Sequence, residues 1–142
     1  RLDLASQFGA DIILEVDKCD VPEVILEHSS NRGADIAFEA VGISDTINTA
    51  IDSVRKGGTV TLIGNVSNQI DLPLQKVVTR QIKLQGSCAI SGEYPEVLDL
   101  INGGKINVES LTSASAPLSD GAEWFSRLQN KEPGLMKVIL NP

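Results

Sequence analysis

The sequence predicts an α/β protein with a parallel sheet. Short apolar runs of strand type, at residues 11–14, 34–41 and 59–63, alternate with segments of helical periodicity, and most segments end at a glycine. Near-continuous apolar strands joined through helices are typical of parallel strands with helices on both faces. The 142 residues are enough for one domain with a genuine core.

The first third of the chain is expected to form helix, strand, helix and strand. Residues 2–8 carry apolar side chains at helical spacing, and Gly9 ends that run. Residues 11–14 are of strand type. Apolar positions at helical spacing recur over residues 21–28, and residues 34–41 are again apolar and compatible with a strand. The chain begins inside a helix without an N-cap, and we expect it to be a fragment.

The middle of the chain continues the alternation. Apolar residues at i, i+3, i+4 and i+7 predict a helix over 44–54, which Lys56-Gly57-Gly58 should stop. Residues 59–63 form the clearest strand of the sequence. A short helix around residues 74–78 then leads to a strand over 82–86.

The last third predicts a second helix and strand pattern. An amphipathic stripe predicts a helix over 94–101, and residues 111–118 are expected to be extended. A helix over 120–128 follows, and a final strand over 136–140 stops before Pro142.

Composition and charge exclude several classes of protein. The 12 basic and 19 acidic residues give a net charge of −7, which repels phosphate backbones and anionic lipid. We therefore expect no nucleic-acid or membrane partner. Hydrophobic residues make up 42% of the chain, which excludes a disordered protein. Two distant cysteines, Cys19 and Cys88, are typical of a reducing compartment, so we expect a cytoplasmic protein.

The residue inventory offers little for catalysis. His28 is the single histidine, and no HxxxH, CxxC, GxGxxG, Walker or GxSxG motif occurs, so no zinc site is expected in this chain. The spacing of His28 with Val21 and Val24 predicts a partly buried structural histidine. Asp35 and Glu39 flank an apolar segment as capping or solvated groups, and no acid–base pair is evident.

The informative residues lie where strands end. Ligands of open parallel sheets bind outside the carboxyl ends of the strands. Three such ends carry glycine beside small or apolar residues, in Ala40-Val41-Gly42, Ile63-Gly64-Asn65 and Gly86-Ser87-Cys88-Ala89. The glycines let backbone approach a flat ligand, but the same glycines also suit tight turns that bind nothing. Cys88 is expected to be a small buried residue rather than a nucleophile.

Several motifs, taken in order, resemble the later part of the nucleotide-binding domain of zinc-dependent medium-chain alcohol dehydrogenases. The resemblance covers essentially the whole chain, and the stretch from Gly86 to Pro95 is most similar to the polyol, sorbitol and threonine dehydrogenase branch. The motifs are Arg1-Leu2-Asp3-Leu4-Ala5, Phe8-Gly9-Ala10-Asp11, Gly33-Ala34-Asp35, Glu39-Ala40-Val41-Gly42, Lys56-Gly57-Gly58, Ile63-Gly64, Gly86-Ser87 and Gly134-Leu135-Met136-Lys137-Val138.

The resemblance implies a Rossmann-type fragment with strands 3 to 6 of the sheet and their helices, followed by a C-terminal α+β segment. Residues 1–88 would be the later part of the NAD(P)-binding domain. Residues 89–142 would pack back on a catalytic domain that this chain lacks. The parent enzyme would transfer hydride between an alcohol or polyol and NAD(P), with a catalytic zinc held elsewhere. This chain alone is expected to be inactive.

The resemblance also assigns roles to residues. Ala40, Val41 and Gly42 match positions that line the adenosine half of the cofactor, and Ile63, Gly64 and Asn65 match positions beside the nicotinamide and its ribose. Ser87, Cys88 and Ala89 match the segment whose backbone holds the carboxamide, and Lys137 matches a basic position near the pyrophosphate. The family's glycine fingerprint would precede Arg1, so the cofactor is expected to be NAD or NADP. Sorbitol dehydrogenases carry an arginine at the position of Ala89, which argues against a plain sorbitol substrate.

Other interpretations stay open at this point. The parent could be a zinc-free quinone-reductase-like member of the same superfamily. The chain could be a stand-alone, non-catalytic module for nucleotide binding or oligomerisation, or part of an unrelated doubly wound domain such as a methyltransferase. The resemblance suggests a homodimer or homotetramer. The resemblance makes residues 11–14 strand 3 and residues 34–41 strand 4 of a Rossmann sheet, whose strands 1 and 2 this chain would lack. We therefore expect residues 11–14 to pair with another strand, or the open edge of strand 34–41 to be buried against another copy of the chain.

Overall fold

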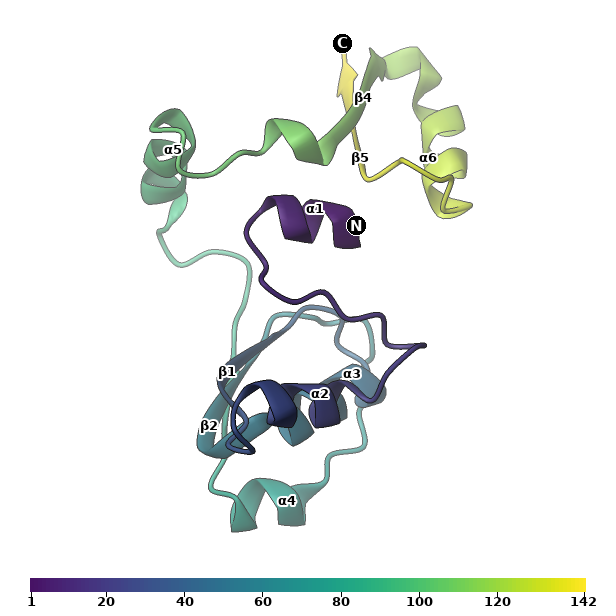
Figure 1. The fold of residues 1–142 in the computed structure, drawn as a ribbon. Helices are drawn as coiled ribbons and strands as arrows, with labels where there is room; N and C mark the ends of the chain where they lie inside the picture. The colour runs from purple at the N-terminus through teal and green to yellow at the C-terminus, as the bar shows by residue number, and fades with distance from the viewer. The chain divides into compact units, whose positions relative to one another are not determined.

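A computed structural model describes all residues from 1 to 142, which form two compact units (Figure 1). Residues 14–91 form one unit, and residues 1–13 together with 92–142 form the other. The sequence predicts a boundary after residue 88, and this domain assignment remains a prediction. None of the helices is long and apolar enough to cross a membrane.

The unit of residues 14–91 is built on a parallel sheet, which confirms the predicted fold class. Its strands lie in the order β1-β2-β3, and both neighbouring pairs are parallel, with Ile36 opposite Thr59 and Thr61 opposite Gln85. Helices connect successive strands. The elements are α2 (Val21–His28), β1 (Ala34–Glu39), α3 (Ser44–Ser53), β2 (Val54–Leu62), α4 (Leu74–Thr79) and β3 (Lys83–Gly86).

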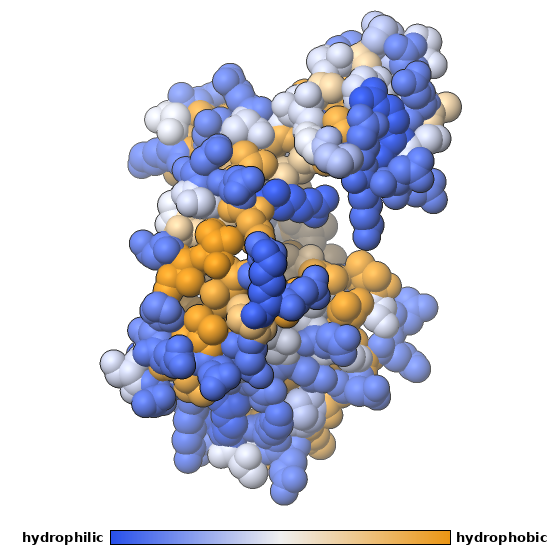
Figure 2. Space-filling view, turned by 45° about the vertical axis from the view of Figure 1, so that its right-hand side comes forward, coloured by the Kyte–Doolittle hydropathy of each residue, from blue (hydrophilic) through white to orange (hydrophobic).

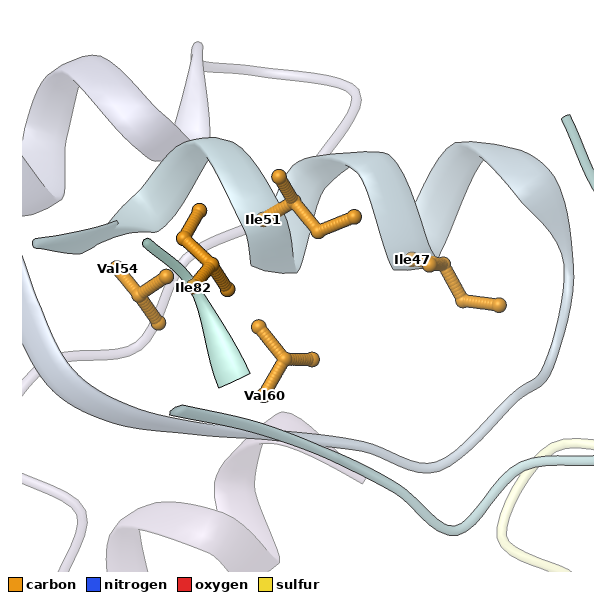
Figure 3. Packing of buried hydrophobic residues seen from close by; sticks show 5 residues of the cluster. All are labelled: Ile47, Ile51, Val54, Val60 and Ile82. Atoms are coloured by element: carbon orange, nitrogen blue, oxygen red, sulfur yellow. The ribbon is translucent and has the colours of Figure 1, made fainter. Parts of the chain in front are cut away.

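One face of this sheet carries the core. Ile47 and Ile51 of α3 form a buried cluster with Val54 and Val60 of β2 and with Ile82, which precedes β3 (Figure 3). Ile51, Val54 and Val60 are fully buried. The helical spacing of the two isoleucines places both on the side of α3 that faces the sheet. The apolar pattern of residues 44–54 therefore predicted the packing of this helix as well as its existence.

The opposite face of the sheet is bare within this unit. Ile36 is 55% exposed and Phe38 is 71% exposed, whereas Ala37, which points the other way, packs against the core. Figure 2 shows apolar residues (orange) gathered on the surface of the molecule in one view. The expectation that helices cover both faces is thus wrong for this unit, because all its buried apolar side chains gather on the side of α3.

Residues 11–14 do not form the expected strand. β1 is an edge strand, with β2 on one side and no strand on the other. Residues 11–14 belong to neither sheet, so the expectation that they pair with another strand is wrong. An isolated strand has no partner for its backbone hydrogen bonds and is not stable by itself. The outer edge of β1 therefore keeps unpaired backbone N–H and C=O groups.

The strand β2 begins earlier than the sequence predicts. It follows α3 directly at Val54 and includes Lys56-Gly57-Gly58, where a stop is expected. The register jumps between Ala34↔Val54 and Ile36↔Thr59, so a bulge on β2 absorbs the extra residues. The guanidinium of Arg80 donates to the carbonyl oxygens of Ile51 and Val54, which satisfies the end of α3.

The second unit contains a strand–helix–strand motif. Its two strands are parallel, with Ser115 opposite Ile139, and α6 connects them, as the sequence predicts. The guanidinium of Arg127 lies 4.0 Å from the ring centre of Trp124 and pairs with the Glu132 carboxylate at 2.7 Å. The elements are α1 (Leu2–Gln7), α5 (Tyr94–Asn102), η1 (Glu109–Leu111), β4 (Thr112–Pro117), η2 (Leu118–Asp120), α6 (Gly121–Gln129) and β5 (Lys137–Asn141).

The replacement Ile51→Ala is expected to destabilise the protein by about 2–5 kcal/mol, because it leaves a cavity at a fully buried position. Ile51→Val should cost only about 0.5–1.5 kcal/mol. Chemical denaturation measures both values. Val78→Ala is the control, since Val78 is 64% exposed and should change stability by less than about 0.5 kcal/mol. Equal losses for Ile51→Ala and Val78→Ala would contradict the packing described for α3.

Asp35 is expected to titrate near pH 2. Its carboxylate accepts hydrogen bonds from Arg32 at 2.7 Å and from Arg55 at 2.5 Å, and these partners lower its pKa from 3.8 to about 2. The stabilisation is fully present above pH 3.8 and is lost as the pH falls through about 2. Carboxyl-carbon NMR gives the titration midpoint. In Asp35→Asn, the unfolding free energy should lose the part of its pH dependence that Asp35 contributes in this window, while the carboxyl groups of Glu39 and Glu132, whose pKa values are also lowered, still contribute. A midpoint near 3.8 in the native protein would refute the pairing.

Candidate functional site

Two turns and a third segment meet at the carboxyl edge of the sheet. Parallel pairing brings the ends of β1, β2 and β3 to one side. The carbonyl oxygen of Glu39 accepts hydrogen bonds from the N–H groups of Ile63 and Gly64 at 2.8 and 3.0 Å, and Ser87 N–H donates to Leu62 at 3.0 Å. The predicted residues Ala40 to Gly42, Ile63 to Asn65 and Ser87 to Ala89 therefore follow adjacent strand ends.

The first two turns cross with their backbones almost in contact. A Cβ atom on Gly42 would lie 2.4 Å from the Asn65 nitrogen, and one on Gly64 would lie 2.2 Å from the Gly42 nitrogen. Gly42 also has a left-handed φ of 86°. Ser67 N–H donates to Gly42 at 3.0 Å and continues the pairing beyond the strands. The crossing of the turns therefore requires glycine at both positions, independently of any ligand at the edge.

Glu39 is a functional candidate that sequence reasoning missed. It was expected to be a capping or solvated group, but it is only 4% exposed. Its Oε1 accepts hydrogen bonds from Val41 N–H at 2.8 Å, Gly42 N–H at 2.9 Å and the Thr46 hydroxyl at 2.8 Å. An acidic residue at the end of an apolar strand, three positions before a glycine, was the available signal.

The charged form of Glu39 is favoured by these donors. Burial alone would raise the pKa of the carboxyl group, because a charge in the interior loses its hydration. Hydrogen bonds from Gly42, Thr46 and Val41 outweigh the burial and bring the pKa below its ordinary value. The end of β1 is thus held by a buried carboxylate rather than by a neutral acid.

The rim of this edge is accessible and partly apolar. Val41 is 44% exposed and Ile63 is 50% exposed. Ser87, Cys88 and Ala89 are exposed too, so the expectation of a buried Cys88 is wrong: the chain leaves the sheet after Gly86 and nothing packs over it. A Cβ atom on Gly86 would meet no atom within 4 Å. Flat ligands can therefore reach this edge.

The edge is open rather than enclosed. A cavity of about 650 Å³ lies in the other unit, where Ser113, Leu128 and Met136 are among its lining residues. Lys137 belongs to that unit too, as the first residue of β5, and its predicted contact with a pyrophosphate stays a prediction.

The structure offers no zinc site among its residues. No three His, Cys, Asp or Glu side chains converge in a way that could hold a metal ion. His28 is the last residue of α2 and is exposed, which corrects the expectation of a partly buried histidine.

The variants Gly42→Ala and Gly64→Ala are expected to destabilise the protein, each by about 1–3 kcal/mol, because the added methyl group meets backbone that must move. Gly42→Ala should be the worse, since its left-handed φ adds about 1 kcal/mol. Thermal and chemical unfolding measure the losses. Gly86→Ala makes the same change at the third strand end, where space is free, and should stay within about 0.5 kcal/mol. Tolerance of Gly64→Ala would show that the turns do not cross this closely.

Comparison with known proteins places these features in a family. The family model described as zinc-binding dehydrogenase matches residues 1–103. D-xylulose reductase A from Aspergillus oryzae is 29% identical over 91% of this chain and 37% of its own length. The (R,R)-butanediol dehydrogenase of Neisseria gonorrhoeae is 26% identical over all of this chain and 41% of its own length.

A solved structure shows the same fold. The 2R,3R-butanediol dehydrogenase from Bacillus subtilis superposes with a TM-score of 0.88 at 26% identity, over 99% of this chain and 40% of that one. The chain thus spans about 40% of the length of the relatives that it matches. Because the family model covers most of the sequence, the chain belongs to the zinc-binding dehydrogenase family.

Proposed function

We propose that this chain is the cofactor-binding portion of an oxidoreductase that transfers hydride between an alcohol or polyol and NAD(P). Its relatives carry the names of polyol and alcohol dehydrogenases. The observation that carries the proposal is the accessible strand edge, where two tightly crossed turns present apolar side chains. Ligands of open parallel sheets bind at such carboxyl edges.

The residues at the edge suit the parts of a dinucleotide. We assign Ala40, Val41 and Gly42 to the adenosine half, where exposed Val41 gives apolar contact. Ile63, Gly64 and Asn65 would lie beside the nicotinamide and its ribose. The exposed Ile63 side chain would pack on the ring and exclude water from it.

The remaining residues would hold the polar groups of the cofactor. Backbone of Ser87, Cys88 and Ala89 would bind the carboxamide, and the ammonium group of Lys137 would pair with the pyrophosphate. The bound nicotinamide supplies the hydride chemistry. The cofactor is NAD or NADP in this proposal.

We propose that the catalytic zinc is bound by another part of the protein. The side chains of this chain do not fit a zinc site, since no group of three ligands converges. A catalytic zinc would therefore be held by residues outside residues 1–142, and the chain alone would be inactive. We further propose a cytoplasmic homodimer or homotetramer, in keeping with two free cysteines and the resemblance to oligomeric dehydrogenases.

Ile63→Asp tests the binding edge in the full-length product of the gene. A carboxylate beside the nicotinamide should weaken NADH binding roughly tenfold or more, because apolar contact is lost and a charge must be desolvated. Titration of NADH, followed by its fluorescence, gives the dissociation constant. Val78→Asp introduces the same charge on the exposed surface of α4, before the amino end of β3, and should leave NADH affinity unchanged.

The same titration separates the alternatives. Failure of the native protein to bind NADH or NADPH would overturn the proposal. Saturable NADH binding by residues 1–142 alone, without activity, would favour a stand-alone binding module. Metal analysis of the full-length protein separates a zinc enzyme from a quinone-reductase-like one: one mole of zinc per mole of protein is expected, and metal-free active protein would contradict the zinc assignment.

A further inference from the structure

The Glu39 carboxylate is buried without a cationic partner. None of the ion pairs in the structure includes Glu39, although it is among the most buried polar residues of the chain. Its charge is balanced only by hydrogen-bond donors. A buried charge held in this way is costly to desolvate, so the donors around it must be fixed in place.

One residue controls both turns at the cofactor edge. The side chain of Glu39 binds the first turn through Val41 and Gly42, and its main-chain oxygen binds the second turn through Ile63 and Gly64. The turns touch at Gly42 and Gly64, where not even a methyl group fits. A shift of the first turn is therefore passed to the second.

The Glu39 carboxylate also determines which groups of the first turn are available to a ligand. Val41 N–H and Gly42 N–H both donate into the buried carboxylate, so neither is free to bind an anion. A negative charge beneath the turn further disfavours phosphate at that place. The carbonyl oxygens of Val41 and Gly42 already accept from Val66 and Ser67 N–H, so the turn offers a ligand mainly the exposed Val41 side chain, which suits an uncharged ribosyl or ring group.

We propose that Glu39 is a positioning residue of the cofactor site: its buried carboxylate turns the donors of Val41 and Gly42 inward and sets the spacing of the two turns that receive the uncharged parts of the dinucleotide. This inference rests on the proposed function. Thr46 on α3 completes the arrangement: the single proton of its hydroxyl has the Glu39 carboxylate at 2.8 Å as its nearer acceptor and the Ile43 carbonyl oxygen at 3.2 Å as the other.

The test compares NADH affinity among variants of the full-length protein. Glu39→Gln places an amide NH₂ group where Oε2 accepts from Gly42 N–H, so two donors face each other and the turn must move. NADH affinity should fall roughly tenfold, as is usual when a hydrogen bond to a charged group is lost. Asp35→Asn is the matched control: the same chemical change on the same strand, at the opposite end, with NADH affinity unchanged.

Two variants of Thr46 test the same positioning role if Glu39→Gln does not fold. Thr46→Val keeps the shape but removes the hydroxyl donor, and NADH affinity should fall roughly threefold to tenfold. Thr46→Ser keeps the donor and should retain the affinity. A lower melting temperature with unchanged affinity in both Glu39→Gln and Thr46→Val would overturn the positioning role.

Binding of cofactor fragments separates positioning from general weakening. ADP-ribose and reduced nicotinamide mononucleotide are titrated separately, below the melting temperature of each variant. If Glu39 sets both turns, both fragments lose affinity in Glu39→Gln, whereas inorganic phosphate binding does not weaken. Loss of phosphate binding alone would contradict the inference. If the native protein binds neither NADH nor NADPH, the proposed function fails and this inference with it; native binding that Glu39→Gln and Thr46→Val retain overturns the inference alone.

Discussion

The close approach of Gly42 and Gly64 is the constraint on which the carboxyl edge of the sheet depends. The turns after β1 and β2 cross with their backbones in contact, and a methyl group on either glycine would lie within 2.4 Å of backbone atoms of the other turn. Hydrogen bonds stabilise this crossing: Gly42 N–H donates to the Glu39 carboxylate, and Ser67 N–H donates to the Gly42 carbonyl oxygen. The two turns are therefore joined by direct backbone contact and hydrogen bonds rather than lying apart as independent loops.

A one-sided core supports this rim. Ile47 and Ile51 of α3 seal one face of the sheet against Val54, Val60 and Ile82. The same helix carries Thr46, which donates to Glu39, so packing of α3 and positioning of the rim are coupled. Burial of a few branched side chains thus fixes both the sheet and the position of the turns at its carboxyl edge.

Because the core lies on one face of the sheet only, the other face and the outer edge of β1 stay uncovered within this unit. Phe38 is 71% exposed, and the outer edge of β1 has no neighbouring strand. Exposed apolar side chains next to an unpaired strand edge are a liability in a protein that stands alone. The chain presents an accessible rim at the strand ends, which we propose as a dinucleotide site, but no group of metal ligands.

The sequence by itself determined the class of the fold and most of its elements. Helical spacing at residues 44–54 and the apolar strands at residues 34–41 and 59–63 depend on local side-chain patterns, so α3, β1 and β2 were predictable. Glycine beside small residues marked the three strand ends for the same reason. Their use as cofactor contacts remains a prediction.

Only the tertiary structure decided the rest, because the outcome depended on neighbours distant in sequence. Residues 11–14 have the composition of a strand but lack a partner strand, and Cys88 is exposed because nothing packs over it. The position of Glu39 before Gly42 was the only signal in the sequence, and it did not predict burial, since an acidic residue at a strand end is usually solvated. Its burial follows from the crossing of two turns more than twenty positions apart, which the sheet alone brings together.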